Sequence, residues 1–127
     1  MTATLAAVAA GGALGSVARY VTVTATSRAF GAGFPLGTLF VNVLGSFAIG
    51  FIACFLLRRF PGEESVRYFL TTGFLGGFTT FSAFSLEVLT LMQRGETQWA
   101  MLYVLASVVL ALIAVFAGYA LAQGVTA

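Results

Sequence analysis

The chain has 127 residues, of which 60% are hydrophobic and only 8% are charged, and its mean hydropathy is +1.02. A soluble domain carries about 25% charged residues, so this composition excludes an ordinary soluble domain and indicates an all-α integral membrane protein. The net charge of +2 is too small for a nucleic-acid-binding surface. Because the apolar runs leave almost no chain outside the membrane, we also expect no catalytic domain and no enzyme.

Four apolar runs are long enough to cross a hydrocarbon core of roughly 30 Å. They cover about residues 5–25, 36–57, 66–92 and 98–122, which predicts a single membrane domain over 1–127 with four transmembrane helices. No Lys or Arg precedes the first run, which argues against a cleaved signal peptide and favours a true span.

The first run carries small residues at helical spacing. Gly11 with Gly15, and Gly12 with Ser16, form small-xxx-small pairs, which let another membrane helix approach closely. Arg19 lies toward the end of this run. Its side chain either extends to the lipid headgroups or faces an aqueous cavity, and both readings are open at this point.

The second run carries a polar stripe on one helical face, formed by Thr38, Asn42 and Ser46. For Ser46 we expect a hydrogen bond to a neighbouring helix. For Asn42 we favour a functional role, because a carboxamide inside the membrane must find partners for two donor hydrogens and two acceptor lone pairs. Cys54 is the only cysteine, so it cannot form an intrachain disulfide, and its apolar surroundings favour a packing role.

The third run contains the most unusual stretch, GFLGGFTTFSAFSLE, at 73–87. Adjacent glycines at 76 and 77 weaken a helix, so we predict a break in mid-membrane, whose backbone groups must be satisfied by protein, water or an ion. Phenylalanines recur every third residue, at Phe78, Phe81 and Phe84, and are expected on one helical face. Glu87 continues the same spacing. In the fourth run, Tyr103 and Ser107 are one helical turn apart.

The arginines do not favour either orientation in the membrane. Arg58, Arg59 and Arg67 lie on the side of the termini, whereas Arg28 and Arg94 lie on the other, joined by Arg19 if it reaches the surface. Orientation follows an excess of positive charge, so we predict insertion in both orientations and an antiparallel homodimer. Broken helices near its axis would offer carbonyl oxygens to a hard cation such as Na⁺, although water satisfies the same groups.

Hydrogen-bond donors predominate among the polar groups assigned to the membrane interior, which favours transport of an anion. Glu87 is the only carboxylate at membrane depth. The donors are the Arg19 guanidinium, the Asn42 amide and the hydroxyls of Thr38, Thr79, Thr80, Ser82, Tyr103 and Ser107. Aromatic ring edges are electropositive, so Phe81 and Phe84 either line the path or simply pack.

Three motifs, GGALGSVARY, PLGTLFVNVLGSFAIG and TTGFLGGFTTFSAFSLE, resemble the Fluc (CrcB-like) family of bacterial fluoride channels over nearly the whole chain. The resemblance implies a dual-topology homodimer in the bacterial cytoplasmic (inner) membrane. Two pores at the subunit interface would let fluoride leak passively out of the cytoplasm.

Matched by position, the resemblance implies roles for particular residues. Asn42, Phe81 and Phe84 would line the fluoride pore, and Arg19 would concentrate anions in a vestibule. The carbonyl groups of Gly76 and Thr79 would hold a structural Na⁺ shared by the two subunits. Polar rows beside the pore would comprise Thr38, Thr80, Ser82, Glu87, Tyr103 and Ser107.

Two other classes of membrane protein compete with this interpretation. A small dual-topology multidrug exporter relies on a carboxylate in its first span, where this chain has Arg19 instead. A purely structural membrane protein would explain the small-xxx-small pairs but would conduct no ions.

Overall fold

A computed structural model describes residues 1–127 as an all-helical protein. The elements are α1 (Thr2–Phe30), α2 (Leu36–Arg59), α3 (Glu64–Tyr68), the π-helical η1 (Phe69–Leu75), α4 (Gly76–Phe78), α5 (Phe81–Gln93) and α6 (Thr97–Val125). Four stretches are long and apolar enough to span a membrane: Thr2–Phe30, Leu36–Arg59, Glu64–Gln93 and Thr97–Val125. The predicted four-helix architecture is therefore confirmed, and each predicted span falls inside one of these stretches.

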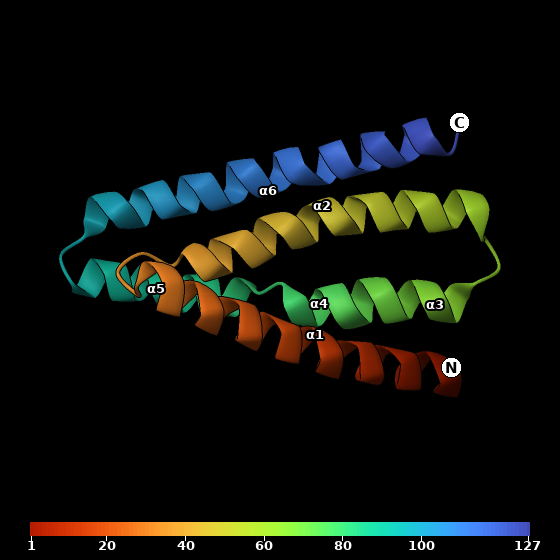
Figure 1. Cartoon of the computed structure of the whole chain (residues 1–127), viewed down its shortest axis with the longest axis horizontal. Coiled ribbons are helices and arrows are strands. Elements are labelled where there is room, and N and C mark those ends of the chain that lie inside the picture. The colour runs from red at the N-terminus through yellow and green to blue at the C-terminus, as the bar shows by residue number, and fades with distance from the viewer.

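The four spans run alternately up and down (Figure 1). Both termini and the loop between α2 and α3 lie at one end, while the α1–α2 and α5–α6 loops lie at the other. Only 20 of the 127 residues are buried, so most apolar side chains point outward, where lipid or a partner must cover them. One copy of the chain does not build a large core of its own.

Glycines bring the helices into close contact at two interfaces. Gly50 and Gly118 bring α2 and α6 together, because a Cβ atom on either residue would collide with the backbone of the opposite helix. Gly11 and Gly15 of α1 lie in the same way against the backbone of 69–78. The prediction that the small residues of the first span serve helix packing is confirmed.

The glycine pair of the third span does not interrupt the helix, contrary to the prediction. Gly76 and Gly77 are both helical, and Gly77 is needed for packing, since a Cβ there would meet the Gly12 carbonyl oxygen. The helix stops two residues later, where Thr79 (φ −88°, ψ 157°) and Thr80 (φ −154°, ψ 125°) are extended.

The interruption separates Phe78 from the phenylalanines that follow it. Phe78 ends α4, is buried and stacks on Phe74 with ring centroids 6.0 Å apart, whereas Phe81 begins α5. The prediction of one continuous face is therefore wrong for Phe78, because two extended residues reset the helical phase. Phe81 and Phe84 do share α5.

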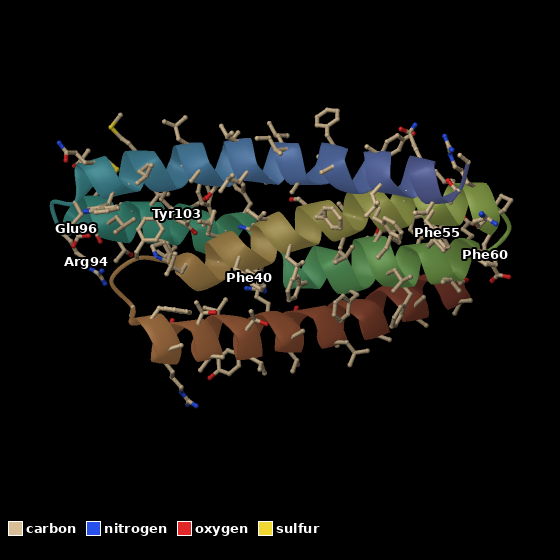
Figure 2. The ribbon with its side chains drawn as sticks, turned by 45° about the horizontal axis from the view of Figure 1, so that its top comes forward. Phe40, Phe55, Phe60, Arg94, Glu96 and Tyr103 are labelled. Carbon is tan, nitrogen blue, oxygen red and sulfur yellow. The ribbon has the colours of Figure 1, made fainter.

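The small core lies between α5 and α6 and consists of Phe84, Leu91, Ala100 and Tyr103. Tyr103 is 0% exposed and lies inside the bundle, while Arg94 and Glu96 lie at the loop end (Figure 2). This core holds α5 against α6 from Phe84, close to the interruption, to Leu91 near the other end of α5.

Candidate functional site

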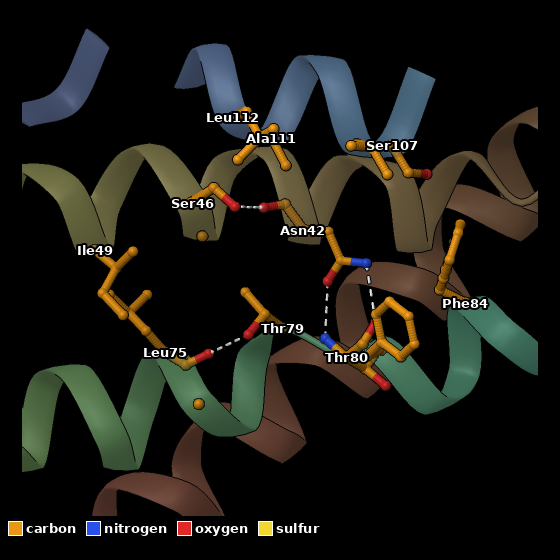
Figure 3. A pocket seen from close by; sticks show the side chains of 14 residues that line it. Asn42, Ser46, Ile49, Leu75, Thr79, Thr80, Phe84, Ser107, Ala111 and Leu112 are labelled. Carbon is orange, nitrogen blue, oxygen red and sulfur yellow. Dashed lines mark hydrogen bonds between the residues drawn. The ribbon is translucent and has the colours of Figure 1, made fainter. Parts of the chain in front are cut away.

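The interruption between α4 and α5 is held by one side chain of α2. Asn42 Nδ2 donates to the Thr80 carbonyl oxygen at 3.0 Å, and the Thr80 N–H donates to Asn42 Oδ1 at 2.8 Å (Figure 3). The predicted need of this carboxamide for partners is thus met by the backbone of an extended residue. One Nδ2 hydrogen remains for another acceptor.

Two carbonyl groups next to the interruption lose their helical donors. In a continuous helix Gly76 would accept from the Thr80 N–H and Thr79 from the Ala83 N–H. Here the Thr80 N–H bonds to Asn42 Oδ1, and the Ala83 N–H bonds to Thr80 Oγ1 at 3.1 Å. The oxygens of Gly76 and Thr79 are therefore available, and neutral carbonyl oxygens suit a hard cation such as Na⁺.

An open pocket of about 410 Å³ lies beside the interruption. It brings together seven of the predicted site residues: Asn42, Gly76, Thr79, Thr80, Phe81, Phe84 and Ser107. The rest of its lining is Gly45, Ser46, Ile49, Leu75, Val108, Ala111 and Leu112 (Figure 3). We refer to these 14 residues as the α2–α5 pocket.

The two phenylalanines of the pocket differ in exposure. Phe81 is 77% exposed, whereas Phe84 is 8% exposed, and their ring centroids lie 5.4 Å apart. Phe84 also packs against the Tyr103 ring at 5.1 Å, with the two ring planes inclined at 60°. The Phe84 ring is thus fixed by the core, while the Phe81 ring extends from the molecule.

Two buried hydroxyls have no hydrogen-bond partner in the chain, those of Tyr103 and Ser107. Ser107 lines the α2–α5 pocket. The Tyr103 hydroxyl lies near Thr38 and Glu87, but no hydrogen bond of acceptable geometry joins it to them. Because unsatisfied buried hydroxyls are uncommon, both groups are candidates for contact with an ion or water.

Thr38 and Glu87 lie outside the α2–α5 pocket. The Thr38 hydroxyl donates to Glu87 Oε1 at 2.7 Å, and both residues line a second pocket of about 130 Å³ that also includes Thr90 and Arg94. The structure therefore places most of the predicted site residues in one of two pockets. Tyr103 lies between them, since its ring contacts Phe84 and its hydroxyl lies near Glu87.

Arg19 extends from α1 to the last turn of α4. Its Nε donates to the Gly77 carbonyl oxygen at 2.9 Å, and the side chain is partly buried. A cation is favourable at this point, because carbonyl groups at a helix C-terminus carry partial negative charge. The side chain thus turns toward the interruption.

The remaining serines have local partners. Ser46 Oγ donates to the Asn42 carbonyl oxygen of its own helix at 2.7 Å, so the predicted bond to a neighbouring helix is wrong. Ser82 is exposed, with Oγ 3.3 Å from Thr80 Oγ1. Gly45 was not among the predicted site residues, yet any side chain there would collide with the Thr79 methyl group. In the sequence, only its position beside the polar stripe of Thr38, Asn42 and Ser46 could have indicated that Gly45 belongs to the site.

Comparison with known proteins places the chain in a family. The model of the family described as CrcB-like protein, Camphor Resistance (CrcB), matches residues 6–119. The chain belongs to this family. With the four apolar helices, membership makes the chain a multi-pass membrane protein.

Relatives of similar length carry one name, "Fluoride-specific ion channel FluC". The protein of Rhizobium meliloti is 53% identical over 114 residues, which cover 90% of this chain and 91% of the relative. That of Paracoccus denitrificans is 52% identical over 120 residues, covering 94% of both chains. That of Agrobacterium fabrum is 49% identical over 119 residues, covering 94% and 95%. The resemblance found in the three motifs is confirmed.

Proposed function

We propose that this protein is a passive, selective fluoride channel that lets fluoride leave the bacterial cytoplasm across the cytoplasmic (inner) membrane. It is a channel and not an enzyme, as the name shared by relatives about half identical to it indicates. The observation that carries the proposal is the α2–α5 pocket, in which an amide, an unpartnered hydroxyl and two aromatic rings meet beside interrupted backbone.

The α2–α5 pocket supplies the groups that a small anion needs. Asn42 retains one amide hydrogen, the buried Ser107 hydroxyl is free to donate, and the ring edges of Phe81 and Phe84 are electropositive. Fluoride exchanges its water for these groups along the pocket. Chloride is larger, and the closed pore would exclude it if its lining is narrow and cannot widen, a rigidity to which the two bonds of Asn42 to Thr80 contribute.

Two copies of the chain are needed to close the path. The pocket is open on one side, and Phe81 projects from the molecule with 77% of its surface exposed. A second copy inserted in the opposite orientation covers this face, so an antiparallel homodimer holds two pores, and each subunit forms a single membrane domain. The interruption of the third span then lies in mid-membrane, where protein or ions satisfy its backbone.

A structural Na⁺ is held by the carbonyl oxygens of Gly76 and Thr79. Support comes from the loss of the helical donors of both groups to side-chain oxygens. When bound, the cation would supply positive charge to carbonyl oxygens that have lost their helical donors.

Polar residues outside the pocket continue the path in two directions. Toward the loop end, Tyr103, Thr38 and Glu87 form a polar row beside the pore, in which the Tyr103 hydroxyl is free to donate. Near α4, Arg19 is bound through Nε alone, so its two terminal nitrogens remain to concentrate anions in a vestibule. Ser82 extends the polar lining from Thr80, which belongs to the pocket, onto the first turn of α5.

Electrical recording from the protein in planar lipid bilayers tests this function. A fluoride channel gives a current that reverses at the fluoride equilibrium potential, with no current when chloride is the only anion. Transport that requires a proton gradient and gives no passive fluoride current would contradict the proposal and indicate the exporter class instead.

A further inference from the structure

The two carbonyl groups assigned to the cation are each released from the helix by a different side-chain oxygen. Asn42 Oδ1 accepts from the Thr80 N–H, which in a continuous helix would bond to the Gly76 carbonyl oxygen. Thr80 Oγ1 accepts from the Ala83 N–H, which in a continuous helix would bond to the Thr79 carbonyl oxygen. We infer that Asn42 and Thr80 are positioning residues of the sodium site, and that Asn42 thereby couples that site to the fluoride path. This inference rests on the proposed function and adds a cause for the site's geometry.

The effect of Asn42 follows from the needs of the Thr80 backbone. Inside a membrane a free N–H has no water to bond, so the Thr80 N–H must have an acceptor. Without Asn42 Oδ1, the nearest acceptor along the chain is the Gly76 carbonyl oxygen, four residues back. A bond between them would continue the helix and remove the Gly76 oxygen from the cation site.

The hydroxyl of Thr80 acts on the other carbonyl in the same way. Thr80 is the N-cap of α5, and its Oγ1 accepts from the Ala83 N–H at 3.1 Å. Removal of the hydroxyl leaves the Ala83 N–H with the Thr79 carbonyl oxygen as its local acceptor. The Thr79 oxygen would then be engaged within the helix.

Asn42 holds Thr80 from both sides, through its N–H and its carbonyl oxygen. The same carboxamide lines the α2–α5 pocket. Loss of fluoride flux in an Asn42 variant would therefore not distinguish a lost ion contact from a collapsed cation site. Cation binding has to be measured separately.

The test is a Na⁺ titration of the purified full-length protein at constant ionic strength, with choline replacing Na⁺. At each Na⁺ concentration the midpoint of thermal unfolding is measured. A cation that binds only the folded protein raises the unfolding midpoint as its concentration rises. We expect Asn42→Leu and Thr80→Val to raise the half-saturating Na⁺ concentration by about tenfold or more, as loss of groups that orient metal ligands commonly does.

Two control variants make the result specific. Thr80→Ser keeps a hydroxyl at the N-cap and should titrate like the wild type. Thr22→Val removes a hydroxyl that bonds only to the Ala18 carbonyl oxygen of its own helix, outside both pockets, and it should also leave the titration unchanged. If Asn42→Leu does not fold, the comparison of Thr80→Val with Thr80→Ser decides the matter.

Equal half-saturating Na⁺ concentrations in the wild type, Asn42→Leu and Thr80→Val would overturn the inference. It would also be overturned if the wild type showed no dependence on Na⁺. Fluoride conduction by the same preparation then separates the proposed channel function from the proposed sodium site. If the protein conducts fluoride but shows no Na⁺ dependence, the channel function stands and only the sodium site is ruled out.

Discussion

Asn42 has two roles in the site. It is the one polar side chain that both lines the α2–α5 pocket and supports the extended backbone at Thr80. Thr38 and Ser46, its neighbours on the polar stripe, bond instead to Glu87 and to the Asn42 carbonyl oxygen. The three residues of the polar stripe thus have three different hydrogen-bond partners.

Asn42→Leu should abolish fluoride flux while the dimer remains assembled. The substitution keeps the size of the side chain but removes the amide donor and both bonds to Thr80. Flux is measured from liposomes, and assembly by size-exclusion chromatography of the purified protein.

Thr22→Val is the matched control for Asn42→Leu, because the Thr22 hydroxyl bonds only to the Ala18 carbonyl oxygen of its own helix, outside both pockets. We expect wild-type flux in this variant. Normal flux in Asn42→Leu would remove the carboxamide from the mechanism.

Ser107→Ala should lower fluoride flux with little loss of stability. The Ser107 hydroxyl is buried without a protein partner, so its removal breaks no internal hydrogen bond and should change the free energy of unfolding by less than about 1 kcal/mol. The hydroxyl lines the pocket, so the ion loses a donor. Efflux assays and thermal unfolding on the same preparation check both parts. A stable variant with unchanged flux would show that the hydroxyl does not contact the ion.

At the level of the helices, α1 packs closely on the part of the third span that precedes the interruption. Gly11 and Gly15 lie against the backbone of 69–78, and Gly77 lies against Gly12. The lack of a side chain at these positions therefore permits the close contact. The helix ends where Asn42 can pair with Thr80.

Gly15→Ala should destabilise the protein by about 1–3 kcal/mol, because the added methyl group would collide with the Phe74 carbonyl oxygen and separate the helices. Gly33→Ala is the control. A methyl group added at Gly33 would meet no other atom within 4 Å, and the substitution should change stability by less than about 1 kcal/mol. Thermal unfolding in detergent compares the two. Equal stability of both variants would contradict this account of the packing.

Sequence patterns predicted the helices well because apolar length and small-residue spacing are local properties. The partners of the polar side chains were not predictable, since Asn42 bonds to a residue 38 positions away and Thr38 to one 49 positions away. The break was assigned to Gly76 and Gly77 on helix propensity, but both residues are helical, and Gly77 packs against α1. The π-helical turn of 69–75 had no sequence signal that we recognised.

At the level of the whole molecule, the proposed antiparallel dimer rests on the balanced arginines for its orientation and on the open pocket for the face that a second copy would cover. Of the six arginines, three lie at the end that holds the termini and two at the opposite end, while Arg19 lies against Gly77. Two-fold pairing would cover the exposed Phe81 and close the α2–α5 pocket.

A single-cysteine labelling experiment tests this orientation. Gly62 lies in the exposed α2–α3 loop with no neighbour within 4 Å, so Gly62→Cys should be tolerated. The native Cys54 is buried and is replaced by alanine in the same protein. A membrane-impermeant maleimide applied to intact cells should label about half of the molecules, since the charge bias is nearly zero. Labelling of nearly all or nearly none would contradict dual topology.

Ion efflux from liposomes that contain the purified protein tests the central claim most directly. The liposomes are loaded with fluoride and chloride, and ion-selective electrodes follow both anions in the external solution. We predict rapid loss of fluoride while chloride is retained. Retention of both ions by folded, reconstituted protein, or loss of both at similar rates, would contradict a fluoride-selective path through the α2–α5 pocket.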